Sequence, residues 1–125
     1  MGLNVNYTAF SGNLTADPEV RYTPSGTACC EITIAHNKSK ERNSDHTIYM
    51  PVAIFGKTAE VCGKTLSKGD QIMVEGELFE NKWTTREGQK RSQIKLMANN
   101  VHFIYLKSSA NKGNNSNYSN SRYQG

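Results

Sequence analysis

The sequence predicts an all-β domain: a closed or nearly closed antiparallel barrel of five strands with one short helix between the third and fourth strands, followed by a disordered tail. Over most of the first 106 residues, apolar and polar residues alternate with a period of two, the pattern of strands buried on one face. After Leu106 the chain becomes rich in Ser, Asn and Gly and cannot bury enough surface to offset the entropy of ordering. We therefore assign residues 1–106 to a folded domain and 107–125 to a disordered tail.

The strands follow from this alternation. A first, less regular strand is expected near 7–14, and a turn with Pro and Gly at 23–26 precedes the second. The other four strands are expected over 28–35, 48–55, 71–79 and 93–98, with Glu87-Gly88 at the tip of the last hairpin. Their inward residues are Ala28, Cys30, Ile32, Ile34, Ile48, Met50, Val52, Ile54, Ile72, Val74, Gly76, Leu78, Ile94, Leu96 and Ala98.

One segment has helical spacing, over about 58–67. Ala59, Cys62 and Leu66 recur at i, i+3 and i+7, Thr58 can cap the start, and Gly69 can close the end. Five strands with a helix between the third and fourth is the strand order of the OB-fold, a partly open barrel that binds oligonucleotides and oligosaccharides. Another small β-barrel or a sandwich is the alternative.

The composition limits the classes of function that this chain can have. The net charge of +4 favours a polyanionic partner. No apolar run approaches the ~20 residues of a membrane helix, and the N-terminus has no secretory signal. The odd number of cysteines, two of them adjacent, predicts buried thiols in a reducing, cytoplasmic compartment. Histidines are scattered and no nucleophile or phosphate-loop motif is present, so we expect no metal, no cofactor and no catalytic residues.

Two aromatic residues in the third strand face away from its aliphatic side. Tyr49 and Phe55 are six residues apart, or about 20 Å along a strand, which is enough to contact different nucleotides. Aromatic rings stack on any base. Packing against a partner subunit or a loop is the alternative. Trp83, the single tryptophan, lies among polar and basic neighbours near the last hairpin tip.

Cations accompany these aromatics. A groove for a single strand needs this combination of cations for phosphates and rings for bases. The predicted binding residues are Tyr49, Phe55, Lys57, Lys82, Trp83, Arg86 and Arg91, with Lys38 and Lys40 from the loop before the third strand.

Four segments resemble the bacterial single-stranded DNA-binding protein family: GNLTADPEVRYTPSGTA (12–28), IFGKTAEV (54–61), LSKGDQIMVEGEL (66–78) and KWTTREGQKR (82–91). The resemblance covers nearly all of 7–106. It implies an OB-fold assembled as a homotetramer, around which single-stranded DNA wraps without sequence preference. The family's binding aromatics correspond to Phe55 and Trp83, its lysine after Phe-Gly to Lys57, and a frequent tryptophan to Tyr49.

The sequence departs from the family pattern in three places. The loop at 36–47 lacks the aromatic that many relatives place there, with Lys40 near that position. Met50-Pro51 replaces a polar pair near residues that the family uses for subunit contacts. Relatives usually end in an acidic tip that recruits replication and repair proteins, whereas no acid follows Glu87 here. Either the chain is truncated, or it is a variant without that recruiting function, such as those of plasmids, phages or other mobile elements.

The sequence therefore predicts a non-enzymatic, sequence-independent single-stranded DNA-binding protein that protects DNA in replication, recombination and repair. Three alternatives stand beside it. One is a primosome-type accessory OB-fold protein that acts mainly through protein partners and binds DNA more weakly. The others are an RNA-binding module and an enzyme acting on nucleic acid.

Overall fold

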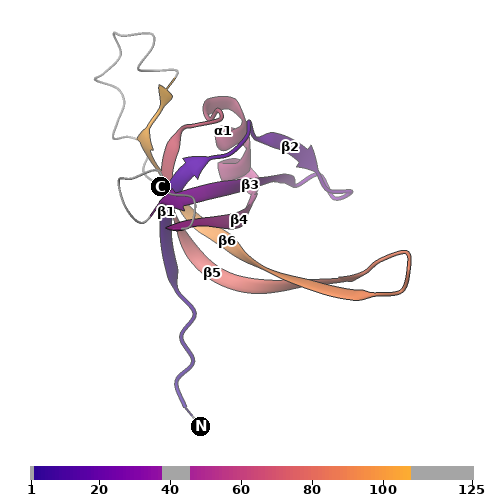
Figure 1. The fold of residues 1–125 in the computed structure, drawn as a ribbon. Helices are drawn as coiled ribbons and strands as arrows, with labels where there is room; N and C mark the ends of the chain where they lie inside the picture. The colour runs from indigo at the N-terminus through magenta and orange to yellow at the C-terminus, as the bar shows by residue number, and fades with distance from the viewer. Residues whose placement is uncertain (1, 38–45, 108–125) are drawn as a thin grey trace.

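The computed structural model describes residues 2–37 and 46–107 (Figure 1). This part of the chain forms six strands and one helix: β1 (Thr8–Leu14), β2 (Glu19–Tyr22), β3 (Ala28–Asn37), β4 (Thr47–Phe55), α1 (Gly56–Thr65), β5 (Gln71–Thr84) and β6 (Lys90–Tyr105). The predicted tail lies outside the described residues apart from Lys107, so the boundary at 106/107 stays a prediction.

The strands form one sheet that closes on itself. Its order is β1-β5-β6-β4-β3-β2, and an additional pairing between β1 and β3 completes a five-stranded ring with β2 attached to the edge of β3. The predicted OB-fold, with mostly strands and a short helix before the last two, is therefore confirmed. One prediction was wrong: the ring is not wholly antiparallel, because β4 and β6 run parallel where Val52 pairs with Leu96 and Ala53 with Met97.

Strand β2 was not predicted. It has only four residues, of which Val20 alone is half-buried, so it has no alternating pattern. The end of β1 pairs with β3 only at Ile34 and Ala35, which leaves the first part of the same β3 edge open. Strand β2 pairs with that part, from Glu19 opposite Glu31 to Tyr22 opposite Ala28. Main-chain pairing of this kind carries almost no side-chain signal.

The predicted inward face is the core, with two exceptions. Most of the predicted even-numbered residues are buried or half-buried, including Ile34, Val52, Ile54, Ile72 and Leu96. Ile48 and Ile94, however, are 52% and 50% exposed. Ile48 lies near the start of β4, and Ile94 lies on the projecting part of β6. At both positions no second layer formed by the described residues covers the sheet. The alternation determines to which side of the sheet a side chain points, but how deeply it is buried depends on where along the strand it lies.

The helix begins two residues earlier than predicted and ends at Thr65. Thr58 is not its cap: the N-cap is Phe55, which makes no side-chain capping bond. Gly56 adopts a φ of +74°, which lets the chain turn directly from β4 into the helix. The predicted apolar stripe is confirmed, since Ala59, Cys62 and Leu66 are at most 5% exposed. Burial raises the pKa of the Cys62 thiol to about 12.

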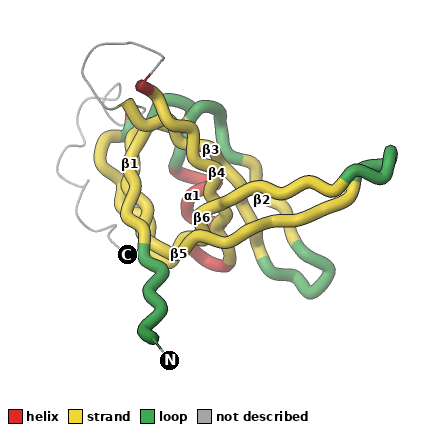
Figure 2. The backbone as a smooth tube through the Cα atoms, turned by 60° about the horizontal axis from the view of Figure 1, so that its bottom comes forward, coloured by secondary structure: helices red, strands yellow, loops and turns green. Residues whose placement is uncertain are grey.

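The last two strands are much longer than predicted and extend away from the ring as a two-stranded arm (Figures 1 and 2). Pairing continues from Gly76–Ala98 out to Thr84–Lys90. Most of the arm from 79 to 95 is exposed on both faces and mainly polar, so it lacks the alternation that marks a half-buried strand. At the base of the arm, β5 and β6 approach so closely that a Cβ on Gly76 would overlap the carbonyl oxygen of Met97.

A buried carboxylate fixes the point where β6 ends. Asp70 is fully buried, and its Oδ1 accepts the backbone N–H of Lys107 at 2.8 Å while its Oδ2 accepts that of Ser67 at 2.8 Å. The loop before β5 is thereby joined to the end of β6. Because a buried carboxylate without partners would be costly, these bonds also fix the path of both segments.

A second polar cluster attaches the N-terminal segment to the sheet. The Tyr7 hydroxyl donates to Glu75 Oε2 at 2.6 Å, and His102 Nε2 lies 2.7 Å from Glu75 Oε1. The hydrogen bond from Tyr7, and then the one with His102, lowers the pKa of Glu75 from its ordinary 4.5. A carboxylate whose folded pKa is lowered contributes stability above its unfolded pKa, and that contribution is lost as the pH falls through the folded pKa.

This cluster gives a pH-dependent prediction. In Tyr7→Phe the carboxylate loses its largest stabilising partner, so the pKa of Glu75 is expected to rise toward 4.5. Titration of the Glu75 side-chain carbonyl by NMR measures this directly. Tyr22→Phe, which removes a hydroxyl from an exposed position on β2, is the control and leaves the titration unchanged. An unaltered Glu75 titration in Tyr7→Phe would refute the assignment.

Candidate nucleic-acid interface

The strand register places the odd-numbered residues of four strands on one surface. Directly paired residues project from the same side of a sheet. Tyr49 pairs with Ala35 and Phe55 with Cys29, and at the junction of β4 and β6 Ala53 pairs with Met97. We call this surface the outer face: the odd-numbered residues of β3, β4 and β5, and of β6 from 91 to 97. It lies opposite the core.

The three predicted stacking residues all belong to the outer face. Tyr49, Phe55 and Trp83 are 62%, 43% and 45% exposed, so their rings are accessible while part of each packs on the protein. Tyr49 and Phe55 lie near opposite ends of β4. Trp83 lies on the arm, directly opposite Arg91. The three rings therefore lie at separate, exposed places on β4 and on the arm and do not form one packed cluster.

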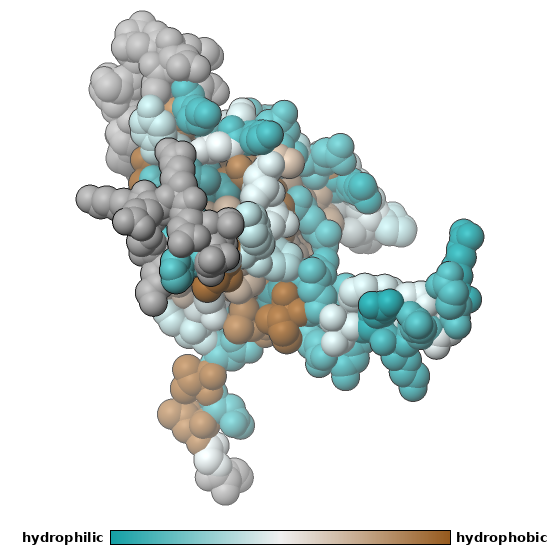
Figure 3. Space-filling view, in the orientation of Figure 1, coloured by the Kyte–Doolittle hydropathy of each residue, from teal (hydrophilic) through white to brown (hydrophobic). Residues whose placement is uncertain are grey.

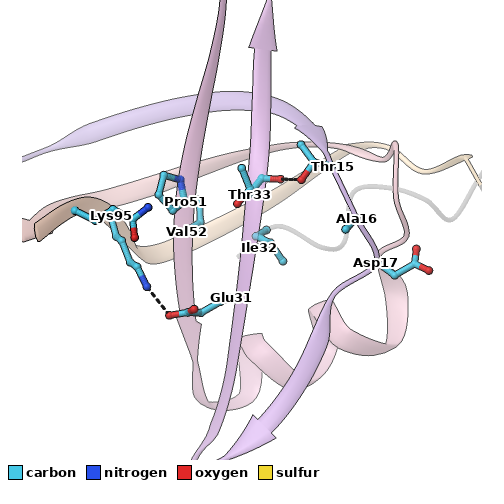
Figure 4. A pocket seen from close by; sticks show the side chains of 10 residues that line it. Thr15, Ala16, Asp17, Glu31, Ile32, Thr33, Pro51, Val52 and Lys95 are labelled. Atoms are coloured by element: carbon cyan, nitrogen blue, oxygen red, sulfur yellow. Dashed lines mark hydrogen bonds and ion pairs between the residues drawn. The ribbon is translucent and has the colours of Figure 1, made fainter. Parts of the chain in front are cut away.

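A groove crosses the outer face between the loop after β1 and the base of the arm (Figure 4). It has a volume of about 340 Å³. Its lining residues are Thr15, Ala16, Asp17, Glu31, Ile32, Thr33, Pro51, Val52, Gln93 and Lys95. Lys95 Nζ lies 2.8 Å from Glu31 Oε2 across the groove, and Thr15 donates to the Thr33 carbonyl at 3.2 Å. Pro51 lies within the groove, where it pairs with Thr33 of β3.

The predicted cations are distributed over several positions. Arg91 shares the outer face with Trp83, and its guanidinium donates to Gln89 at 2.8 Å. Lys82 projects from the other face of the arm and lies 3.7 Å from Glu80. Arg86 lies in the tip, where Gly88 donates to the Thr85 carbonyl. Lys57 is exposed in the first turn of α1, two residues after Phe55. Lys38 and Lys40 lie outside the described residues.

The arm has a mainly hydrophilic surface along its length (Figure 3). Between Phe79 and Lys95 it carries five cations and two acids. A hollow of about 370 Å³ beside the arm is lined from both faces, by residues that include Lys82, Trp83 and Arg91. The two faces therefore meet at this hollow, and a chain molecule lying in it would contact the indole and both cations.

Sequence reasoning missed the residues in the middle of the outer face. Lys95, Gln93 and Glu31 line the groove, but none was among the predicted binding residues. The register of the hairpin could have identified two of them: counting back from the tip at Glu87-Gly88 places Arg91, Gln93 and Lys95 on the same face as Trp83. Glu31 required the pairing of β3 with β4, which no local pattern specifies.

The fold and this surface define a class: a small OB-fold protein that presents accessible rings and cations together, as proteins that hold single-stranded nucleic acid do. The family model described as the single-strand binding protein family matches residues 5–104. The chain belongs to this family. Among the described residues, no helix is long and apolar enough to cross a membrane.

Two curated relatives show the extent of the similarity. The single-stranded DNA-binding protein of Wolinella succinogenes is 37% identical over 112 residues, which cover 86% of this chain and 69% of the relative. That of Treponema pallidum is 35% identical over 104 residues, which cover 81% of this chain and 58% of the relative. The similarity therefore spans the OB-fold, while both relatives are longer than their aligned parts.

Proposed function

We propose that this protein binds single-stranded DNA without sequence specificity, without catalysing a reaction, and protects it during replication, recombination and repair. The observation that carries the proposal is the outer face, on which three accessible rings lie with Arg91 in a chain of the single-strand binding protein family. The proposed contacts are Tyr49, Phe55, Lys57, Lys82, Trp83, Arg86 and Arg91, with Lys38 and Lys40 from the segment outside the described residues.

In the proposed mechanism the aromatic rings bind the bases and the cations bind the phosphates. A ring stacks on any base, because every base has a π-face, and each such contact contributes about 1–3 kcal/mol. Cations of the arm neutralise phosphates and release counterions, which makes the affinity fall as salt rises. Neither contact reads a base edge, so the combination favours binding without sequence preference.

The single tryptophan provides the test. Titration with oligo-dT at low salt is expected to quench Trp83 fluorescence strongly, because a stacked base contacts the indole directly. The quenching should weaken as salt rises, with a log–log slope of about −0.7 for each phosphate neutralised. Matched oligo-rU shows whether RNA is bound as well. Absence of quenching and of any mobility shift at low salt would contradict the proposed function.

We further propose a cytoplasmic homotetramer. Exposed apolar side chains away from the outer face support self-association, among them Leu3 and Val5 in the N-terminal segment and Ile104 near the end of β6. Light scattering at low and high salt measures the number of 13.9 kDa chains per particle. A dimer with weak DNA affinity would instead favour the accessory-protein alternative.

A further inference from the structure

Of the two acidic residues that line the groove, Asp17 and Glu31, the second lies in the middle of the outer face, where a polyanion would be expected to pass. Glu31 projects from β3 beside Ala53 of β4, between the Phe55 end of the face and the base of the arm. It lines the groove, and its carboxylate is the partner of the Lys95 ammonium at 2.8 Å (Figure 4). A fixed negative charge at this place opposes the contacts that the surrounding residues make.

The two partners differ in accessibility. The Lys95 side chain is 13% exposed, whereas that of Glu31 is 60% exposed. The carboxylate is thus the more accessible member of the pair. A phosphate that enters the groove therefore meets a negative charge first, and the Lys95 ammonium already has a carboxylate partner.

We propose that Glu31 limits the affinity of this surface for single-stranded DNA by holding Lys95 in an intramolecular ion pair that a phosphate must replace. The proposal rests on the proposed DNA-binding function. In this proposal, Lys95 is a phosphate contact, and Glu31 competes with the phosphate for its ammonium group. The pair contributes little to folding, because an ion pair with one well-exposed partner is worth little.

Removal of the carboxylate charge tests this proposal. Glu31→Gln keeps the shape of the side chain and frees the ammonium, so the affinity for oligo-dT at low salt is expected to rise about fivefold. The salt slope should become steeper by about 0.7, the value for one added phosphate contact on a single strand. Glu60→Gln is the control, since it makes the same charge change on α1, outside the groove.

A second pair of variants separates release of Lys95 from a general charge effect. In Lys95→Gln the gain from adding Glu31→Gln is expected to be clearly smaller and the increase in salt slope to disappear, because no ammonium is left to be freed and only the repulsion by the carboxylate is removed. Thermal melting confirms that each variant is folded. An unchanged affinity and slope in Glu31→Gln, or an equal gain in Glu60→Gln or in the Lys95→Gln background, would overturn the inference. If the unsubstituted protein binds no DNA at all, it is the proposed function that fails.

Discussion

Replacing Trp83 with alanine is expected to weaken binding of single-stranded DNA by about 1–3 kcal/mol, or roughly five- to 150-fold in Kd. The indole is 45% exposed on the outer face and lies directly opposite Arg91, so a base stacked on it also brings its phosphate near a cation. The loss should be similar for dT and dC oligomers, because stacking does not read base edges. Anisotropy of a labelled oligomer measures it in the absence of tryptophan.

Two other variants make this prediction specific. Trp83→Phe retains a ring and should recover most of the affinity. Ile94→Ala removes an exposed apolar side chain from the opposite face of the same arm and should leave the affinity nearly unchanged. The stacking role is wrong if Trp83→Ala binds as tightly as the unsubstituted protein, or if Ile94→Ala weakens binding equally. The same measurement on Tyr49→Ala and Phe55→Ala ranks the three rings.

Gly76→Ala is expected to lower the free energy of unfolding by about 3 kcal/mol, the upper end of ordinary overpacking. The added methyl group would overlap the Met97 carbonyl oxygen, which belongs to the backbone and cannot turn aside like a flexible side chain. The β5–β6 ladder must therefore shift at the irregularity between Glu75 and Gly76, where the arm leaves the ring. Urea denaturation, with the slope m checked for constancy, measures the change.

The control for this prediction is another glycine in open surroundings. A Cβ on Gly2 would meet nothing within 4 Å, so Gly2→Ala should leave the unfolding midpoint unchanged. Loss of stability in both variants to the same extent, or in neither, would show that the close approach at Gly76 has no energetic importance.

The predictable part of the fold was the part with a buried face. Strands such as β3 and β5 alternate because one side packs on the core, and that alternation can be read without any knowledge of the partner strands. Strand β2 and the outer half of β6 were missed, because backbone pairing holds them together and their side chains carry no periodic signal. The capping role of Thr58 was wrong because Gly56 starts the helix earlier, directly at the end of β4.

The candidate site also has a part that the sequence predicts and a part that depends on the strand register. Tyr49, Phe55 and Trp83 could be selected from the sequence because large rings at outward positions are conspicuous. That Arg91 lies opposite Trp83 whereas Lys82 lies on the other face of the arm depends on the hairpin register. The ion pair between Glu31 and Lys95 joins residues that are 64 positions apart in the chain.

The class of fold, the inward face of each alternating strand and the rings available for stacking could all be inferred from the amino-acid sequence, because each depends on residue type and local period. Three other features became visible only in the folded molecule: the sheet closes through a parallel pairing of β4 with β6, the last hairpin extends as an arm, and Glu31 holds Lys95 within the groove. These features arise from contacts between distant strands, where register and curvature, rather than local composition, determine which side chains meet.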